Sequence, residues 1–454
     1  MPSPWYQDAF IAHSYPLGQC GAPPVNDFRT PPTPRLDQLR AWIDHLRWLG
    51  ADAVYLGPVF ESSSHGYDTA DYRLVDRRLG TDGTLAGLTR ALHDAGIRVI
   101  LDGVFHHVGR DFWAFRDLQQ NGEHSPFRDW FSGVDFSQRS PLGDPFSYDA
   151  WEGHFDLVKL NLGHPGVREH LFEAVRSWVD RFEIDGLRLD VAYALDPDFV
   201  RALADACHAL RPEFWLLGEA IHGDYRRIAG PGLLDAVTNY ECYKGLYSSH
   251  NDRNLFEIAH SLDRQFGDGG LYRDLTTYNF VDNHDVDRIA STLRDPAHLA
   301  PVHLLLVTMP GVPSIYLGSE WGIEGARSQG DDRPLRPPLP TPEAGRALGR
   351  HPDLAPFIAR LAAIRRRLPA LRHGSYHQLL IASEQFAFER RLDHDRAYIA
   401  INISSSPATL NLPVAAPDGD TFADQLAPES PCSVLNGHLT LDLPPHSGRI
   451  LARP

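Results

Sequence analysis

Short apolar runs that alternate with amphipathic stretches are the feature of this sequence that most constrains its fold. The run Ile97–Phe105 (IRVILDGVF) is nearly all apolar until its end, as is typical of a strand buried on both faces of a parallel sheet. Segments such as Arg35–Leu49, whose apolar residues recur at the spacing of one helix face, separate these runs. Repeated strand–helix units therefore predict an α/β fold with a parallel sheet wrapped by helices.

Eight strands of this kind can be placed along the first 320 residues. They are Ala9–Tyr15, Ala51–Leu56, Ile97–Phe105, Gly186–Leu189, Phe214–Glu219, Leu234–Tyr240, Thr277–Val281 and Pro313–Leu317. Eight strand–helix units fit a closed (β/α)8 TIM barrel, in which chemistry takes place at the C-terminal ends of the strands. A loop over residues 62–72 is expected after the second strand.

Two parts of the chain depart from this alternation. Residues 109–156, after the third strand, contain several Gly and Pro and no sustained periodicity, which predicts an inserted subdomain rather than a loop. From residue 371 to 454, short strands separated by Gly, Pro, Asn and Asp turns predict a C-terminal antiparallel β-sandwich. The catalytic barrel is accordingly assigned to residues 1–108 and 157–370.

Charge and composition exclude several classes of partner. A formal net charge of −16 argues against binding nucleic acid or an anionic membrane surface, whereas a neutral substrate would be indifferent to it. No apolar run reaches the roughly 20 residues needed to cross a bilayer, and no signal peptide is visible. The four cysteines show no metal-ligand spacing. We expect a cytoplasmic protein with reduced thiols, and a secreted form supplied without its leader is the alternative.

Polar side chains follow several of the predicted strands at the point where each strand ends. They are Asp102 and His106-His107 after the third strand, Arg188 and Asp190 at the fourth, Glu219 at the fifth, and Asn283-His284-Asp285 at the seventh, with His65, Tyr67 and Asp68 in the loop after the second. A buried Arg–Asp pair that locks a strand is the structural alternative for any one of them. Three carboxylates, an arginine and two histidines on one barrel rim favour a catalytic site instead.

Two carboxylates on neighbouring strands suit the cleavage of a glycosidic bond with retention of configuration, which requires a separation of about 5–5.5 Å. Asp190, two residues from the guanidinium of Arg188, suits an ionised nucleophile. Glu219 follows an apolar run, where desolvation would raise its pKa and hold the proton needed for acid catalysis. Asp285, beside His284, could bind ring hydroxyls and share the charge that develops in the transition state.

The same segments resemble the α-amylase family, family 13 of the glycoside hydrolases, over almost the whole chain. The matching motifs are DGVFHH (Asp102–His107), GLRLD, GEA (Gly218–Ala220) and FVDNHD (Phe280–Asp285), with HGYDTADY, KLN and GVPSIYLGSE as accessory signatures. Within the family the chain is most similar to enzymes that act on small maltodextrins, of the cyclomaltodextrinase, neopullulanase and cyclic maltosyl-maltose hydrolase types.

The resemblance implies Asp190 as nucleophile, Glu219 as general acid/base and Asp285 as transition-state stabiliser. It also implies residues that bind the sugar in the −1 subsite. Arg188 would orient Asp190, and His107 and His284 would form hydrogen bonds with the sugar. Tyr67 would be the stacking platform with Asp68 beside it, and Asp102 would support the site's architecture.

Three further residues are implied on the side of the leaving-group sugar. DRPLRPPL (Asp332–Leu339) is similar to a loop that holds the next sugar through an acid and an arginine, here Asp332 and Arg336. A surface ion pair is the alternative for these two. His222, three residues past Glu219, could contact the leaving-group sugar, with an ordinary loop histidine as the alternative.

No cofactor or metal is expected to be required. His106 stands where many members of the family have an asparagine that binds structural calcium, and imidazole is a poor ligand for this oxygen-seeking ion. The expected partner is a small neutral oligosaccharide, bound by a monomer or a homodimer.

The predicted activity is retaining hydrolysis of α-1,4 bonds, with α-1,6 bonds as a second candidate, in short or cyclic maltodextrins through a covalent β-glucosyl-enzyme intermediate. A transglycosylase, a trehalose-forming isomerase or a phosphorylase would use the same intermediate with another acceptor. A non-catalytic binding subunit is the alternative from another class, against which the retained carboxylates argue.

Overall fold

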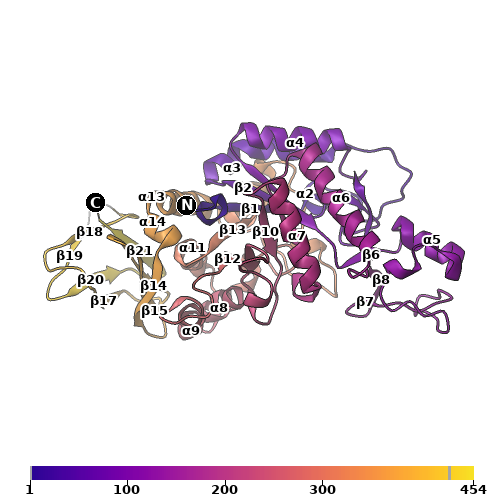
Figure 1. Ribbon diagram of the computed structural model, residues 1–454. Helices are drawn as coiled ribbons and strands as arrows, with labels where there is room; N and C mark the ends of the chain where they lie inside the picture. The colour runs from indigo at the N-terminus through magenta and orange to yellow at the C-terminus, as the bar shows by residue number, and fades with distance from the viewer. Residues whose placement is uncertain (1–2, 428–430, 454) are drawn as a thin grey trace.

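The computed structural model describes residues 3–427 and 431–453. Its centre is a closed barrel of eight parallel strands, as predicted (Figure 1). In order around the barrel they are β1 (Ile11–Ser14), β2 (Ala53–Leu56), β5 (Arg98–Gly103), β9 (Gly186–Leu189), β10 (Trp215–Gly218), β11 (Ala236–Thr238), β12 (Thr276–Asn279) and β13 (Val312–Tyr316). The last strand pairs with the first, Ser314 lying opposite Ile11, which closes the ring.

Helices cover the outside of the barrel. The longer ones are α4 (Asp82–Asp94), α6 (Pro165–Phe182), α7 (Pro197–Leu210), α8 (Tyr240–Asn251), α9 (Phe256–Phe266), α11 (Leu299–Thr308) and α13 (Leu354–Arg367). The shorter ones are α1 (Trp5–Asp8), α2 (Pro16–Gln19), α3 (Ile43–Leu49), α10 (Ile289–Thr292), α12 (Pro342–Leu348) and α14 (Pro369–His373).

Local sequence explains where these helices start and how they pack. Helix α7 begins with a proline in its first turn, and the side chain of Asp196 caps it by accepting a hydrogen bond from the Phe199 amide at 2.8 Å. In α6 the buried residues recur along one face, and Trp178 stacks on Phe60 with ring centroids 4.1 Å apart. This packing holds the helix against β3 (Phe60–Ser62), the short strand that follows β2.

Two local predictions differ from the structure. The first half of the helix expected over Arg35–Leu49 is a 3₁₀ helix, η1 (Arg35–Trp42), and only α3 is α-helical. The loop expected over residues 62–72 is wrong in its second half, because β4 (Thr69–Val75) pairs antiparallel with β3 (Phe60–Ser62). The turn of this hairpin carries Tyr67 and Asp68.

The chain between β5 and α6 forms a small structure of its own, in the place where an inserted subdomain was predicted. A three-stranded antiparallel sheet, in the order β6 (His107–Gly109), β8 (His154–Lys159), β7 (Ala150–Trp151), accompanies α5 (Trp113–Asn121). The boundaries of this subdomain at residues 109 and 156 stay a prediction. Its sheet runs from His107 to Lys159. Figure 1 shows the insertion and the C-terminal strands at opposite ends of the molecule.

The C-terminal part contains two antiparallel sheets. One has six strands, β14 (Ser375–Ile381), β15 (Gln385–Leu392), β16 (Asp395–Asn402), β21 (Ser447–Ala452), β18 (Thr421–Asp424) and β19 (Cys432–Ser433), and the other pairs β17 (Ala408–Pro413) with β20 (His438–Leu443). Apolar residues of both sheets, among them Leu412, Phe422 and Leu439, share one buried cluster.

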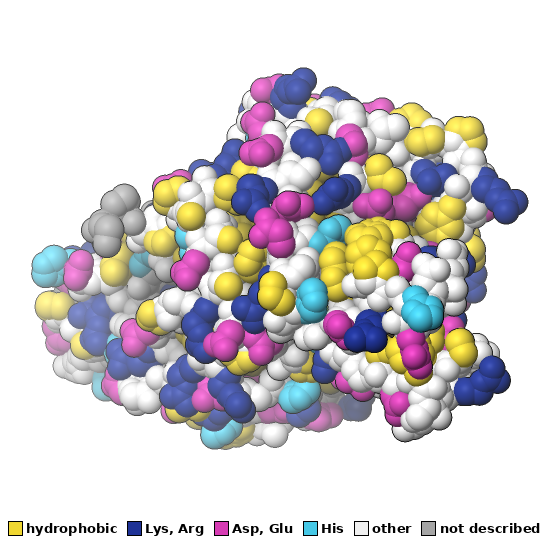
Figure 2. All heavy atoms as spheres, turned by 45° about the vertical axis from the view of Figure 1, so that its right-hand side comes forward, with side chains coloured by type: hydrophobic (Ala, Val, Ile, Leu, Met, Phe, Trp, Pro, Cys, Tyr) yellow, Lys and Arg dark blue, Asp and Glu magenta, His cyan; other side chains and the backbone are white. Residues whose placement is uncertain are grey.

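The surface carries no large area of one charge sign on the face shown in Figure 2, where acidic and basic side chains are interspersed. Within residues 3–427 and 431–453, no helix is both long enough and apolar enough to span a bilayer.

Candidate active site

Arg188 lies at the centre of the predicted site. It is only 4% exposed and belongs to β9. Its Nη1 donates to Asp102 Oδ1 at 2.9 Å and to Asp190 Oδ1 at 2.8 Å, and its Nη2 lies 2.7 Å from Glu219 Oε1. One guanidinium therefore binds the carboxylates that end β5, β9 and β10, three adjacent strands of the barrel.

The turn after Asp190 is strained. Val191 has a φ of +50°, a left-handed conformation that is a genuine outlier for a β-branched residue. This conformation lets the Val191 amide donate to Glu219 Oε2 at 2.9 Å. The backbone after the predicted nucleophile thus positions the predicted acid, and strain retained at such a place is a common property of functional sites.

The two carboxyl groups are less different than the sequence suggested. We expected Arg188 to favour ionised Asp190 and an apolar run to favour protonated Glu219, but the guanidinium binds both. Burial raises the pKa of Glu219 and of Asp190, and Arg188 opposes this rise in each. Their titrations are therefore properties of the pair.

Hydrogen bonding, rather than the guanidinium, distinguishes the two groups. Both oxygens of Glu219 have donors, Arg188 and the Val191 amide. Among the residues that the structure describes, the polar atom beside the second oxygen of Asp190, Oδ2, is the ring nitrogen Nε2 of His107 at 3.8 Å, beyond hydrogen-bond distance. This leaves the Asp190 oxygen available to a reacting atom.

Asp285 lies beyond β12, between the imidazole of His284 and the guanidinium of Arg336. Its Oδ2 is 2.9 Å from His284 Nε2, and its Oδ1 accepts a hydrogen bond from Arg336 Nη2 at 2.8 Å. Burial alone would raise the pKa of Asp285, but His284 and Arg336 outweigh it and hold the pKa below its usual range. Asp285 is therefore an ionised group.

Asp102 and Tyr67 connect this network to Arg188. The hydroxyl of Tyr67 donates to Asp102 Oδ2 at 3.0 Å and also contacts His284 Nε2. The same Asp102 oxygen accepts from the Tyr55 hydroxyl at 2.7 Å. These donors and Arg188 occupy both oxygens of Asp102, and its supporting role stays a prediction. One face of the Tyr67 ring stacks on His284, with centroids 5.6 Å apart.

His107 is a buried neutral imidazole at the rim. It is 1% exposed, burial lowers its pKa to about 3, and its Nε2 has no hydrogen-bond partner among the described residues. Next to it, burial and the charge of Lys159 lower the pKa of His106 to about 4, and the Nδ1 atoms of the two histidines lie 3.2 Å apart. Nitrogen donors beside an ammonium do not fit calcium, and the expectation that none binds at His106 stays a prediction.

Asp332 and Arg336 are joined to the site rather than isolated on the surface. Arg336 bonds Asp332 at 3.2 Å, donates to the His284 carbonyl at 2.8 Å, and places its guanidinium 4.4 Å from the centroid of the Tyr15 ring. Arg327, which no sequence motif singles out, contacts Asp332 and donates to the carbonyl of Asp285 at 3.0 Å. It comes from an irregular loop without a motif.

Two predicted residues lie apart from this network. Asp68 accepts hydrogen bonds from Ser64 Oγ at 2.6 Å and the Gly66 amide at 3.2 Å, so it holds its own turn. His222 is exposed, and its ring centroid lies 5.1 Å from that of Tyr193. Tyr193 in turn donates to Glu152 at 3.0 Å, a link between the insertion and the loop after Asp190 that the sequence did not predict.

Comparisons with known proteins agree with this geometry. The family model described as alpha amylase, catalytic domain, matches residues 36–337. A cyclomaltodextrinase of Geobacillus thermopakistaniensis (strain MAS1) is 31% identical over 433 residues, which cover 91% of this chain and 70% of the relative. Neopullulanase 2 of Thermoactinomyces vulgaris is 31% identical over 482 residues, which cover 98% of this chain and 78% of the neopullulanase.

Among solved structures, the cyclic α-maltosyl-(1→6)-maltose hydrolase of Arthrobacter globiformis superimposes with a TM-score of 0.81 at 25% identity, over 100% of both chains. The barrel, the carboxylates that meet at its rim and these likenesses lead to one conclusion. The chain belongs to the α-amylase family of glycoside hydrolases and acts on α-glucans.

Proposed function

We propose that this protein is a retaining hydrolase that cleaves α-1,4 glucosidic bonds, and α-1,6 bonds alongside them, in short or cyclic maltodextrins. The observation that carries the proposal is the shared guanidinium of Arg188, which holds Asp190 at 2.8 Å and Glu219 at 2.7 Å from adjacent strands. Two carboxyl groups held on one cation are close enough to act on the two sides of one glycosidic bond.

In the first step the free oxygen of Asp190 attacks the anomeric carbon while Glu219 gives its proton to the departing glycosidic oxygen. The bond from the anomeric carbon to that oxygen breaks, and a covalent β-glucosyl ester forms on Asp190. In the second step Glu219 takes a proton from water, the water oxygen attacks the same carbon, and Asp190 leaves. Two inversions give net retention of the α configuration.

Surrounding groups favour the charge that develops on the sugar ring. Ionised Asp285 stabilises the oxocarbenium-like transition state, and neutral His107 offers a hydrogen bond to a ring hydroxyl. Arg336 binds Asp285 and Asp332 together, so it can order the acid that faces the sugar on the leaving side. Tyr67 supplies an aromatic surface at the rim.

The names of the relatives support a small, neutral substrate, since a cyclomaltodextrinase and a cyclic maltosyl-maltose hydrolase are similar over most of the chain. A cytoplasmic location is part of the proposal, and it is supported by three buried thiols, Cys20, Cys207 and Cys242, that form no disulfide. Size-exclusion chromatography with light scattering would decide between a monomer and a homodimer.

The test is substitution of each carboxyl with its amide. Glu219→Gln should lower kcat/KM for maltotriose by about 10²- to 10⁴-fold, as loss of a general acid does, and Asp190→Asn should lower it at least as much. Asp196→Asn, which retains the cap of α7 outside the site, is the control and should keep wild-type activity. Wild-type rates in either active-site variant would refute the assignment.

Product analysis tests the finer points. Maltotriose, pullulan, γ-cyclodextrin, cyclic maltosyl-maltose and starch identify the linkage and size preferences, and proton NMR during the first turnovers should show the α anomer. Repeating the reaction with added glucose or phosphate distinguishes hydrolysis from transfer, because an acceptor would intercept the ester on Asp190 in a transglycosylase or phosphorylase.

A further inference from the structure

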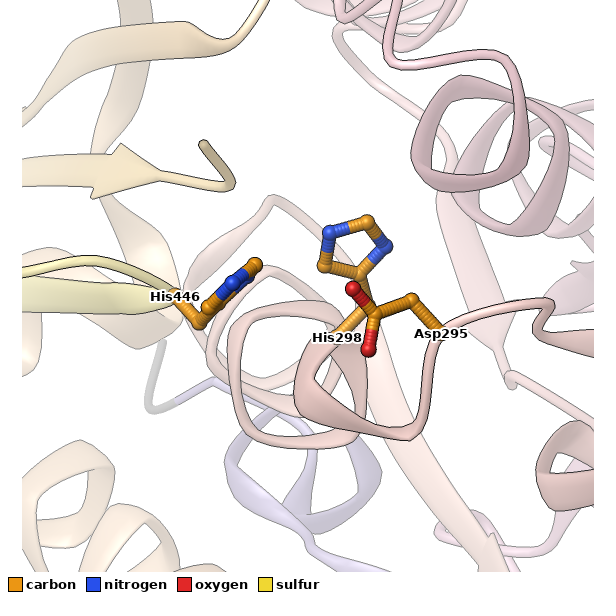
Figure 3. Close-up of side chains that lie close together, drawn as sticks. All are labelled: Asp295, His298 and His446. Carbon is orange, nitrogen blue, oxygen red and sulfur yellow. The ribbon is translucent and has the colours of Figure 1, made fainter. Parts of the chain in front are cut away.

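Asp295, His298 and His446 gather where the barrel meets the C-terminal sheets (Figure 3). Asp295 caps the 3₁₀ helix η6 (Pro296–His298), to which His298 belongs, and His446 lies in the turn between β20 and β21. One candidate ligand atom from each side chain lies within 4.8 Å of the other two. A carboxylate and two imidazoles form a typical set of zinc ligands.

The buried imidazole of His298 is oriented as a ligand would be. It is 3% exposed, and its Nε2 lies 3.0 Å from the carbonyl oxygen of Ile403. A carbonyl can only accept, so Nε2 carries a proton, and in the neutral ring the lone pair is then on Nδ1. That Nδ1 is buried and has no hydrogen-bond partner among the described residues. Histidines that bind metals commonly donate their other ring N–H to a backbone carbonyl in this way.

The other two side chains complete the arrangement. Nδ1 of His446 is also buried and has no hydrogen-bond partner within residues 3–427 and 431–453, and the ring centroid of His446 lies 5.3 Å from that of His298. His446 has a φ of +48°, a left-handed conformation that a histidine adopts infrequently. Asp295 uses Oδ1 to accept from the Ala297 amide at 2.9 Å, which leaves its other oxygen for a cation. Asp295 and His446 are partly exposed, which gives an ion access.

We propose that Asp295, His298 and His446 bind one zinc ion, with water as the fourth ligand. Two imidazole nitrogens and one carboxylate oxygen suit zinc and disfavour calcium and magnesium, which prefer oxygen alone. The side chains need to close from their present separation to metal–ligand distances of about 2.0–2.2 Å. His446 belongs to the C-terminal region and the other two ligands belong to the barrel, so the ion would link the barrel to the C-terminal sheets. The link would lie beside α11, which packs against β16 and β21.

Metal binding can be measured on the full chain after dialysis against a chelator. Wild-type protein titrated with zinc should bind one ion per chain, measured by mass spectrometry of the metal, and cobalt in its place should give the visible absorption of a tetrahedral site. Absence of stoichiometric zinc and of this absorption would overturn the proposal.

Two variants assign the ligands without disturbing the local backbone. Asp295→Asn retains the helix cap, since asparagine caps as well as aspartate does, and His446→Asn retains a residue that tolerates left-handed φ. Each should weaken zinc binding by at least about tenfold, as loss of even an outer-shell partner does. Zinc should also raise the melting temperature of the wild type but not of the variants.

The control is His394→Gln, which removes an exposed histidine of the same C-terminal region. It should bind zinc as the wild type does and show the same rise in melting temperature. Equal zinc binding by all four proteins, or a loss in His394→Gln as large as in His446→Asn, would show that the ion binds elsewhere and would refute the assignment.

Discussion

Replacing Arg188 with lysine tests whether the guanidinium fork, and not only its charge, builds the active site. Arginine places separate N–H groups on Asp102, Asp190 and Glu219 at 2.7–2.9 Å. The ammonium of lysine retains the charge but is a single atom on a flexible stem, so it cannot reproduce this fork. At least one of the two catalytic carboxylates should therefore lose its donor.

The size of the effect follows from one lost contact. A hydrogen bond to a charged group contributes about 1.5–3 kcal/mol, and each 1.36 kcal/mol changes a rate tenfold. Arg188→Lys should accordingly lower kcat/KM for maltotriose by about 10- to 150-fold. Because Arg188 lowers the pKa of both carboxyl groups against the effect of burial, a less well placed cation raises both pKa values further. Both limbs of the kcat/KM profile should then move to higher pH.

The matched control is Arg390→Lys. Arg390 is 1% exposed and donates to the carbonyl groups of Gly374 and Thr308, so its replacement also disturbs a buried guanidinium but none of the catalytic carboxylates. It should lower the melting temperature and leave kcat/KM and its pH profile unchanged. An Arg188→Lys enzyme with kcat/KM within twofold of wild type and unmoved limbs would refute the reasoning.

Three further outcomes are expected. Tyr67→Phe removes the hydroxyl that bonds Asp102 and His284 but retains the ring. It should lower kcat/KM about tenfold, the effect of one hydrogen bond of about 1.4 kcal/mol, with an unchanged melting temperature, and an unaltered rate would contradict this. Burial lowers the pKa of His303 to about 4, below that of an unfolded histidine, so its contribution to stability is present above about pH 6.5 and is lost as the pH falls toward 4. At pH 5 this loss amounts to about 2 kcal/mol, so urea denaturation of His303→Leu should show a smaller drop in unfolding free energy between pH 7 and pH 5 than the wild type. Gly311 has a φ of +103°, and an added Cβ would lie 2.4 Å from Thr277 Oγ1. Gly311→Ala should therefore cost about 2–5 kcal/mol in urea denaturation, and a cost under 1 kcal/mol would contradict the close approach.

The sequence predicted the barrel because several of its strands, such as β2 and β10, are buried on both faces and consist of apolar residues. Strands with one exposed face are harder to predict, because polar residues alternate with apolar ones along them. In β17, Leu410 and Leu412 are buried while their neighbours are exposed. The hairpin strand β4 was missed because its polar residues Thr69, Asp71 and Arg73 resemble those of a loop.

That the proposed catalytic carboxylates share one rim of the barrel could be predicted from the sequence for a geometric reason. Asp190 and Glu219 directly follow apolar strands, so the topology alone sets them on one rim. Partnerships between side chains could not be found in this way. The contacts of Arg188 with both carboxylates depend on side-chain rotamers. The contact of Arg327 with Asp285 also depends on the conformation of a loop, which the spacing of apolar residues does not predict.

The pairing of β1 with β13 has a consequence for synthesis of the chain. β1 ends at Ser14 and β13 begins at Val312, about 300 residues later, so one edge of the first strand has no neighbour until the last has been made. At about 5–20 residues per second this interval lasts roughly 15–60 s. Throughout this interval the ribosome-bound chain carries an unpaired strand edge that could pair with a wrong partner. The barrel has no unpaired strand edge only after β13 has been synthesised and has paired with β1.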